Sequence, residues 1–250
     1  MRWRSASFAK SGGNGPDSVR SPAVISNIGS IPGFHEPFAS LSHLLAAGVF
    51  AVLGVRLVRR ARGDARRVAA LSIFAFTTVL LLSMSGVFHL LDEGTSARNV
   101  LGRLDKAAIF ALIAGTHTPV QTLFFRGLAR WGVLAAMWLL AACGITLFSV
   151  FYHALPPGLG TGTYIAMGWL AGLAGIQVWR REGTAGVRLL LLGGLFYSLG
   201  AILLGLDWPT LLPGIFGPHE LWHVAVLAAL ACHWRFFFEH TGRSTERVRT

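Results

Sequence analysis

Long apolar stretches, separated by short polar breaks, fill most of this 250-residue chain. Seven of them are about 20 residues long, enough for a helix to cross a hydrocarbon layer of about 30 Å. Apolar residues run on continuously within each stretch, which indicates helices and not the alternating strands of a membrane barrel. The pattern predicts an all-α, polytopic membrane protein, a bundle of seven transmembrane helices at residues 39–58, 68–91, 105–125, 131–151, 161–180, 186–206 and 219–238.

The segments outside these stretches define the expected domain limits. Residues 1–35 are rich in Ser, Gly, Arg and Pro and lack a sustained apolar run, so we expect a disordered tail there. No apolar core follows the first arginines, which argues against a signal peptide. The membrane domain then covers 36–238, and 239–250 form a basic tail. Inside the domain, small residues suit close helix packing, as at Gly168, Gly172, Gly193 and Gly194.

Composition and charge support the membrane assignment. The chain is 53% hydrophobic and only 13% charged, with a formal net charge of +11. Such a charge would suggest nucleic acid for a soluble protein, but here the arginines cluster between spans and no basic patch alternates with a stacking surface. We therefore expect no nucleic-acid partner. Cys143 and Cys232 lie inside apolar stretches, where we expect small core residues and not a disulfide pair.

The charges also predict the orientation of the chain. With short loops, consecutive helices are antiparallel, and 15 of the 22 Lys and Arg residues fall on the membrane face that holds the C-terminus. The positive-inside rule then places the C-terminus in the cytoplasm. We expect a multi-pass protein of a bacterial inner (plasma) membrane.

Chemistry-bearing residues mark three of the stretches. The string His219-Glu220-Leu221-Trp222-His223 opens the last one, and two histidines four apart on a helix project from one face, which suits a shared metal ion. Ser85 and His89 lie near the end of the second stretch, and Asp105 starts the third. All lie towards the membrane face that holds the N-terminus. Polar groups of this kind belong in a bilayer only with partners or a function.

These residues suit a zinc site. His89, His219 and His223 supply three imidazoles, which leaves zinc (Zn²⁺) an open position of the catalytic type. Asp105 could accept a hydrogen bond from a zinc-bound water and draw off its proton. Ser85 lies one turn before His89 and could orient a ligand or an oxyanion. The alternative is that each histidine sits at a helix end and faces the lipid headgroups.

Two acidic residues near the three histidines, Glu220 and Asp92, can each be interpreted in two ways. Glu220 is the general base of soluble zinc proteases that carry the same string, but it points about 100° away from His219 around the helix. It either supports the ligands or is a first-turn acid favoured by the helix dipole. Asp92 is either a support for the site or an interfacial residue, and we favour the interface.

The remaining histidines are expected to lie outside the ligand set. His43 and His153 could support the site, but we favour a place at the membrane interface. His117 lies deeper in its stretch and is expected to bond across helices. His233 lies towards the opposite face, away from the cluster.

Several motifs resemble one known family. They are Ser85-x-x-x-His89, RLDKAAIFALIAGTHTP at 103–119, GGLFYSLG at 193–200 and FGPHELWH at 216–223, with Glu36 and Ser42-His43 similar to the family's start. Together they resemble the hemolysin III branch of the progestin and adipoQ receptor superfamily over residues 36 to 238. Two departures are Lys106, where the family usually has histidine, and His117, where it has an aromatic residue.

This resemblance implies a seven-helix bundle with zinc bound by His89, His219 and His223. It also implies that Asp105 holds the zinc-bound water and that Ser85 supports the site. The superfamily contains alkaline ceramidase-like enzymes, which implies hydrolysis of lipid amides, whereas the branch name comes from haemolysis, interpreted as pore formation. The adiponectin receptors of the superfamily have a cytoplasmic N-terminus, opposite to the orientation that the charges favour here.

Three hypotheses follow for the function. The leading one is a zinc-dependent hydrolase of a lipid amide or ester, with the bilayer and a lipid substrate as its partners. The second is a pore-forming or receptor-type protein with a structural zinc. The third, an intramembrane zinc protease, is suggested by the His-Glu-x-x-His string alone. Protein partners, the substrate and the oligomeric state are not predicted.

Overall fold

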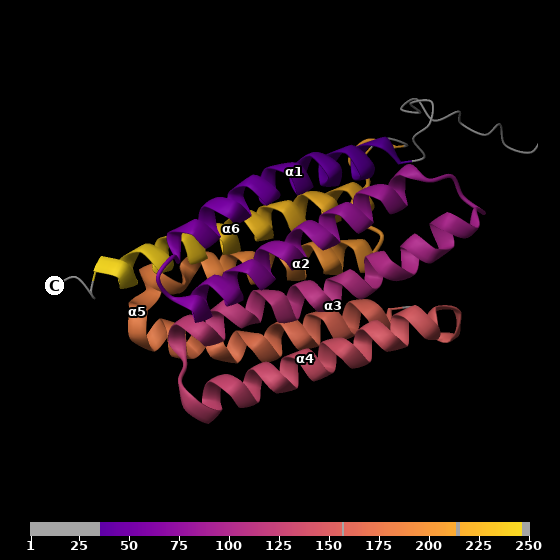
Figure 1. Cartoon of the computed structure of the whole chain (residues 1–250). Coiled ribbons are helices and arrows are strands. Elements are labelled where there is room, and N and C mark those ends of the chain that lie inside the picture. The colour runs from indigo at the N-terminus through magenta and orange to yellow at the C-terminus, as the bar shows by residue number, and fades with distance from the viewer. Residues whose placement is uncertain (1–35, 157, 214–215, 247–250) are drawn as a thin grey trace, which may run out of the picture.

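The computed structural model describes residues 36–156, 158–213 and 216–246, and most of these residues are helical. The expected tail at 1–35 lies outside these ranges. Within them the elements are α1 (Pro37–Arg60), α2 (Ala65–Leu90), α3 (Ser96–Phe124), α4 (Gly127–Val150), a short 3₁₀ turn η1 (Tyr152–Ala154), α5 (Leu159–Gly205) and α6 (Pro218–Glu246) (Figure 1). All six α-helices are long and apolar enough to cross a membrane, as expected of an all-α polytopic protein.

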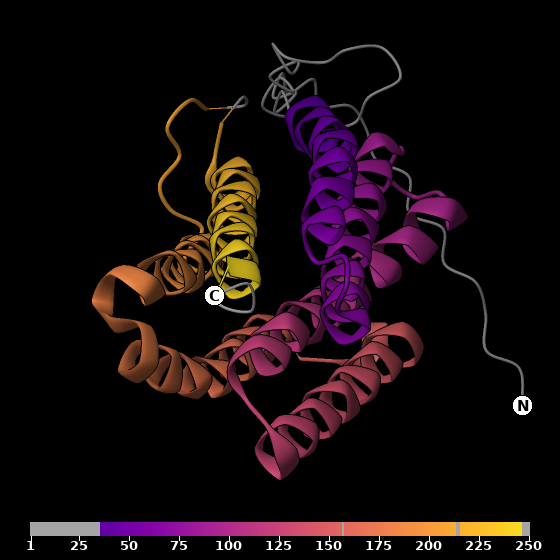
Figure 2. The ribbon, with the colours of Figure 1, turned by 60° about the vertical axis from the view of Figure 1, so that its left-hand side comes forward.

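The fifth and sixth expected spans form a single element. α5 has 47 residues, and a straight helix of that length would measure about 70 Å, roughly twice the hydrocarbon thickness. At Gly183 the backbone leaves the helical region, with φ 71° and ψ −177°, and the ribbon reverses direction (Figure 2). The described chain therefore has six α-helices and not seven separate ones. Glycine adopts this left-handed φ without strain, so one residue replaces the expected loop.

α3 begins before the expected span of 105–125, because Thr95 caps an earlier start. The Thr95 hydroxyl accepts a hydrogen bond from the backbone N–H of Arg98 at 3.2 Å, and the helix starts at Ser96. Asp105 is consequently well inside α3 and not at its beginning. Hydropathy misses these first turns because they are polar. Similarly, α6 extends to Glu246, past the expected end at 238.

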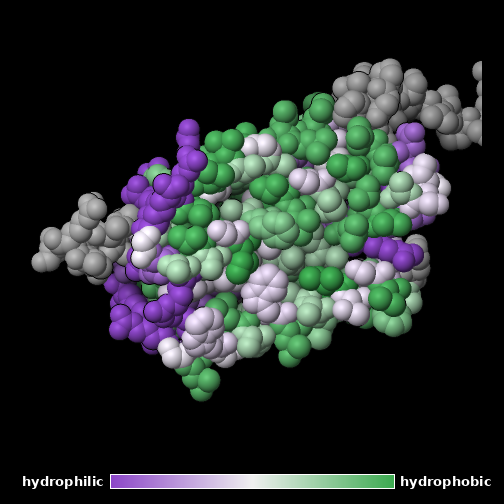
Figure 3. All heavy atoms as spheres, in the orientation of Figure 1, coloured by the Kyte–Doolittle hydropathy of each residue, from purple (hydrophilic) through white to green (hydrophobic). Residues whose placement is uncertain are grey.

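The helices pack as a bundle around α3, which contacts α2, α4, α5 and α6. α1 packs between α2 and α6, and α6 also packs against the second half of the bundle through α5. In Figure 3 apolar side chains cover the middle of the molecule, and hydrophilic ones gather at its two ends. This distribution suits a protein that crosses a bilayer several times.

One core cluster joins the four helices that carry the candidate site. It consists of Ala47, Phe50, Leu81, Leu82, Ala108, Leu112, Val226 and Leu230, from α1, α2, α3 and α6.

The two cysteines confirm one prediction and contradict another. Cys143 and Cys232 are both free, but Cys143 is exposed and so is not a core residue. Its stretch is apolar on all sides, so hydropathy could not distinguish the face that packs from the face that meets lipid.

Candidate metal centre

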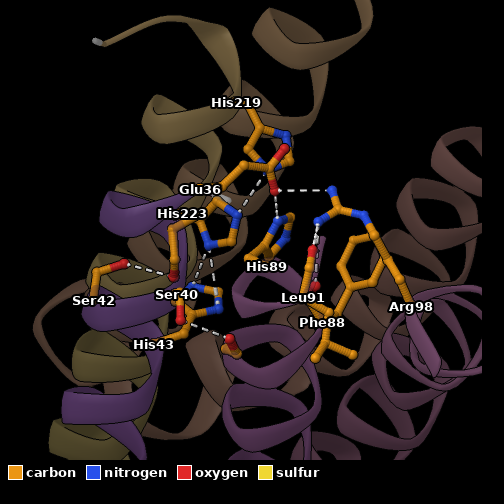
Figure 4. A network of polar contacts seen from close by, with 12 residues as sticks. Glu36, Ser40, Ser42, His43, Phe88, His89, Leu91, Arg98, His219 and His223 are labelled. Carbon is orange, nitrogen blue, oxygen red and sulfur yellow. Dashed lines mark hydrogen bonds and ion pairs between the residues drawn. The ribbon is translucent and has the colours of Figure 1, made fainter. Parts of the chain in front are cut away.

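Three histidines converge at one end of the bundle. His89 comes from the last turn of α2, and His219 and His223 come from the first two turns of α6. One ring nitrogen of each lies within 4.8 Å of those of the other two. The Nε2 atoms of His219 and His223 are 3.1 Å apart (Figure 4). His89 and His223 are buried, at 3% and 1% exposure.

The start of α6 is held by Glu220. Its carboxylate accepts a hydrogen bond from the backbone N–H of Gly217 at 2.8 Å, and Pro218 is the first helical residue. An acid at this position that reaches back to the residue before the helix is half of a capping box. Of the two interpretations left open by the sequence, the structure supports the first-turn acid. Glu220 thereby fixes the turn that carries His219.

His43 contacts His223 on the side of the ring opposite to His219. It is buried at 2% exposure, and its two ring nitrogens are 2.9 and 3.2 Å from Nδ1 of His223. The favoured interfacial placement of His43 is therefore wrong. Its position near a helix end suggested the interface, but α1 turns this face inward between α2 and α6. The side chain of His153 lies outside the described part of the chain.

Glu36 contacts a second histidine of the cluster, His89. Its carboxylate pairs with Nδ1 of His89 and lies 3.4 Å from a guanidinium nitrogen of Arg98. The backbone N–H of Glu36 also donates to the carbonyl of His89 at 3.1 Å, which ties the start of α1 to the end of α2. Burial alone raises the pKa of Glu36, but the hydrogen bond with His89, the neighbouring imidazoles and Arg98 lower it to about 2.

Sequence reasoning assigned Glu36 no part in the site. The available signals were an acid directly before Pro37, where the first helix starts, and the resemblance of this position to the family's start. Arg98 was equally unforeseen as a neighbour of the site. Its guanidinium lies 4.7 Å from the centre of the Phe88 ring and bonds to the carbonyl of Leu91, so it braces the end of α2.

The donor set fits zinc. Four-coordinate zinc has zinc–nitrogen distances of about 2.0–2.1 Å, which places neighbouring ligand atoms about 3.3 Å apart in a tetrahedron. The 3.1 Å between the Nε2 atoms of His219 and His223 is close to this separation. Metal-binding histidines usually have a partner on the other ring nitrogen, which orients the ring. Glu36 and His43 provide such partners for His89 and His223.

The two candidate catalytic residues lie beside this cluster. Ser85 is buried one turn before His89, and it lies near Asp105. Lys106, the departure from the family pattern, donates to the Tyr152 hydroxyl at 2.6 Å. Its ammonium group therefore has a partner other than Asp105. Asp92 is exposed after the end of α2, in agreement with the interfacial interpretation.

Comparison with known proteins identifies the family. The family described as haemolysin-III related matches residues 34–234. The chain belongs to this family. The resemblance drawn from the motifs is thus confirmed for the haemolysin III family, and the match includes all three clustered histidines, Ser85 and Asp105.

Curated relatives of this haemolysin-III related chain come from bacteria and animals. It is 35% identical to Hemolysin-3 of Bacillus cereus over 169 residues, which cover 68% of this chain and 74% of that protein. It is 32% identical to the Hemolysin-3 homolog of Bacillus subtilis (strain 168), over 68% of this chain and 76% of the relative. The human monocyte to macrophage differentiation factor is 27% identical over 204 residues, 78% of this chain and 79% of that protein.

Proposed function

We propose that this protein is a zinc-dependent hydrolase of lipid amide or ester bonds. The observation that carries the proposal is the convergence of His89, His219 and His223 in the membrane domain. Three protein nitrogens leave a zinc coordination position for water or substrate, which is typical of catalytic sites, whereas structural sites usually have four protein ligands. In this proposal Asp105 is the proton acceptor, and Ser85, which lies near it, is its support.

The residues of the chain have distinct parts in the proposed reaction. Zinc held by the three histidines would polarise the substrate carbonyl and make a bound water more acidic. Asp105 accepts a proton from the attacking water and delivers it to the leaving group. Ser85 holds the carboxylate of Asp105 in place. His43 and Glu36 keep the rings of His223 and His89 in the orientation that binding requires.

The depth of the site supports a lipid substrate. The histidines occupy the last turn of α2 and the first turns of α6, near one end of the apolar belt. In a bilayer, lipid amide and ester carbonyls lie between the headgroups and the acyl chains, so a site at the end of the apolar belt would face them. Lateral diffusion in the bilayer can therefore bring a lipid carbonyl to the cluster without removing the lipid from the membrane.

The proposal is tested with purified protein in lipid nanodiscs. We expect turnover of labelled ceramides or labelled phospholipids, its loss after zinc is removed with a chelator, and its return when zinc is added back. Turnover that persists in zinc-free protein contradicts the zinc-dependent mechanism. A complete lack of turnover across amide and ester lipids by zinc-loaded protein contradicts hydrolysis itself.

Pore formation is the second candidate, favoured by the name Hemolysin-3 of two relatives. Release of a trapped dye from liposomes distinguishes it from hydrolysis. Dye release that is the same for native protein and for the His219→Ala/His223→Ala variant would support a pore that does not need the metal. The zinc protease hypothesis loses its main support, because Glu220 caps α6 where such a protease needs a base.

The topology that accompanies this proposal has seven membrane crossings. The two arms of α5 on either side of Gly183 each account for one crossing, and the other five helices account for one each. Arg59 and Arg60 end α1 at the face away from the histidines, in line with the excess of positive charge on that side. We therefore place the C-terminus in the cytoplasm and the metal centre towards the outer face.

Replacing Glu36 by glutamine is expected to weaken zinc binding about tenfold, because the neutral amide is a poorer partner for the His89 ring. Titration against a competing chelator measures this change. Glu239→Gln is the matched control, since Glu239 pairs with Arg235 much further along α6. Equal zinc affinity of the two variants would remove Glu36 from the account of the site.

A further inference from the structure

A cavity of ≈140 Å³ lies inside the bundle, beyond the histidine cluster. It is lined from α2, α3, both arms of α5 and α6, and Leu81, Ile113 and Val226 are among its apolar walls. A Cβ added at Gly168 or Gly194 would meet no atom within 4 Å, so these two glycines border open space. The close packing expected at these two positions is absent. A cavity of about 150 Å³ can hold benzene, so this one fits a segment of a hydrocarbon chain.

Three residues that line the cavity also carry buried polar atoms without hydrogen-bond partners. These atoms are Nδ1 of His117, the hydroxyl of Tyr197 and Nδ1 of His233, and each is buried without a partner among the described residues. His117 and His233 are only 8% and 6% exposed. The Tyr197 and His233 rings are 5.8 Å apart, yet they do not bond to each other. Buried polar groups normally have partners, so this set indicates a missing ligand.

The hydrogen-bonding chemistry of this set selects a hydroxyl group. Nε2 of His233 lies 3.2 Å from the carbonyl oxygen of Leu190, and a carbonyl can only accept. In the neutral ring the proton is therefore on Nε2, and Nδ1 is an acceptor. The Tyr197 hydroxyl can donate. A ligand hydroxyl donates to one and accepts from the other, whereas a ketone could only accept.

These groups lie far from the metal centre. His233 follows His223 by ten residues on α6, about 15 Å along the helix. His117 follows Asp105 by twelve residues on α3, about 18 Å along that helix. A lipid with its polar end at the membrane surface would thus present the middle of its chain to this set.

We propose that this cavity binds a hydrocarbon chain that carries a hydroxyl group near its middle. The apolar walls hold the chain, and Tyr197 and His233 hydrogen-bond its hydroxyl, with His117 as a further partner. The site recognises the chain by its own contacts and requires no metal. A hydroxylated acyl chain is the ligand class that fits.

The test is a competition measured by native mass spectrometry. Purified protein is incubated with equal amounts of 12-hydroxyoctadecanoate and octadecanoate. The two protein–lipid complexes differ in mass by one oxygen atom and are therefore distinguished in the spectrum. We expect the hydroxylated acid to be bound about three- to tenfold more, as one or two net hydrogen bonds would give. Tyr197→Phe and His117→Phe should each reduce this preference, and Tyr197→Phe, which removes the proposed donor, should reduce it more.

Tyr164→Phe is the matched control. Tyr164 also lines the cavity, but its hydroxyl donates to the backbone carbonyl of Lys106 at 3.1 Å, so the preference should not change. Gly194→Leu fills the open space and should weaken binding of both acids. The His219→Ala/His223→Ala variant should keep the preference, which separates this site from the proposed zinc chemistry. Equal binding of the two acids by native protein, or an unchanged preference in Tyr197→Phe, overturns the proposal.

Discussion

Asp105→Ala is expected to lower the rate of lipid hydrolysis by about 10²- to 10⁴-fold while zinc stays bound, the usual range for loss of a general acid–base group. Asp105 lies beside Ser85 and close to His89, but it is not one of the three clustered histidines. Its loss therefore removes the proton acceptor and leaves the proposed ligands in place. Turnover of labelled ceramides and phospholipids, measured beside the zinc content, separates the two effects.

Asp92→Ala provides the control for this experiment. Asp92 is an exposed acid just after α2, so its removal changes the local charge without touching the cluster. We expect it to keep nearly full turnover. If the Asp105→Ala protein hydrolyses lipids as fast as native protein, Asp105 has no part in the chemistry.

The second large effect concerns the metal. His223→Ala is expected to reduce zinc affinity by more than about 100-fold, because losing a ligand costs more than losing the partner of a ligand. His223 is buried, its Nε2 faces His219, and His43 holds its other nitrogen. Titration of the apo-protein against a competing chelator gives the affinity.

His233→Ala is the matched variant for this measurement. His233 lies on the same helix and is also buried, but it contacts the carbonyl of Leu190 far from the cluster. We expect its zinc affinity to equal that of native protein. The same loss of affinity in both variants would point to general damage to α6 and not to removal of a ligand.

The sequence predicted the helical membrane domain and the three histidines that converge in the candidate site. Helix length is set by bilayer thickness, so apolar runs of about 20 residues are a strong signal. The fixed 3.6-residue period places His219 and His223 on one face without any tertiary information. Alternation of antiparallel helices then brings His89 to the same depth. These inferences depend only on the geometry of a single helix and on the number of spans between the residues.

Tertiary contacts between helices could not be predicted in the same way. Hydropathy shows that α1 spans the membrane, but its apolar residues do not reveal which face turns inward, so His43 was placed at the interface. Glu36 precedes the apolar run and was left out for that reason. Gly183 was counted as part of a loop, although a single positive φ there joins two spans in one element.

The cavity could not be predicted from the sequence either. Glycines that pack closely and glycines that border empty space look alike in a sequence. Gly193 packs against His233, where an added Cβ would lie 2.3 Å from its Nε2, whereas its neighbour Gly194 meets nothing within 4 Å. Only the three-dimensional arrangement distinguishes a packing residue from the wall of a binding site.

The central claim is that the three clustered histidines bind zinc, and metal analysis of the purified protein tests it most directly. Native protein, purified without added metal or chelator, is compared with a variant in which His89, His219 and His223 are all alanine. The site predicts about one zinc per native chain and only background zinc in the variant. Native protein without zinc, or equal zinc in both proteins, would contradict the account.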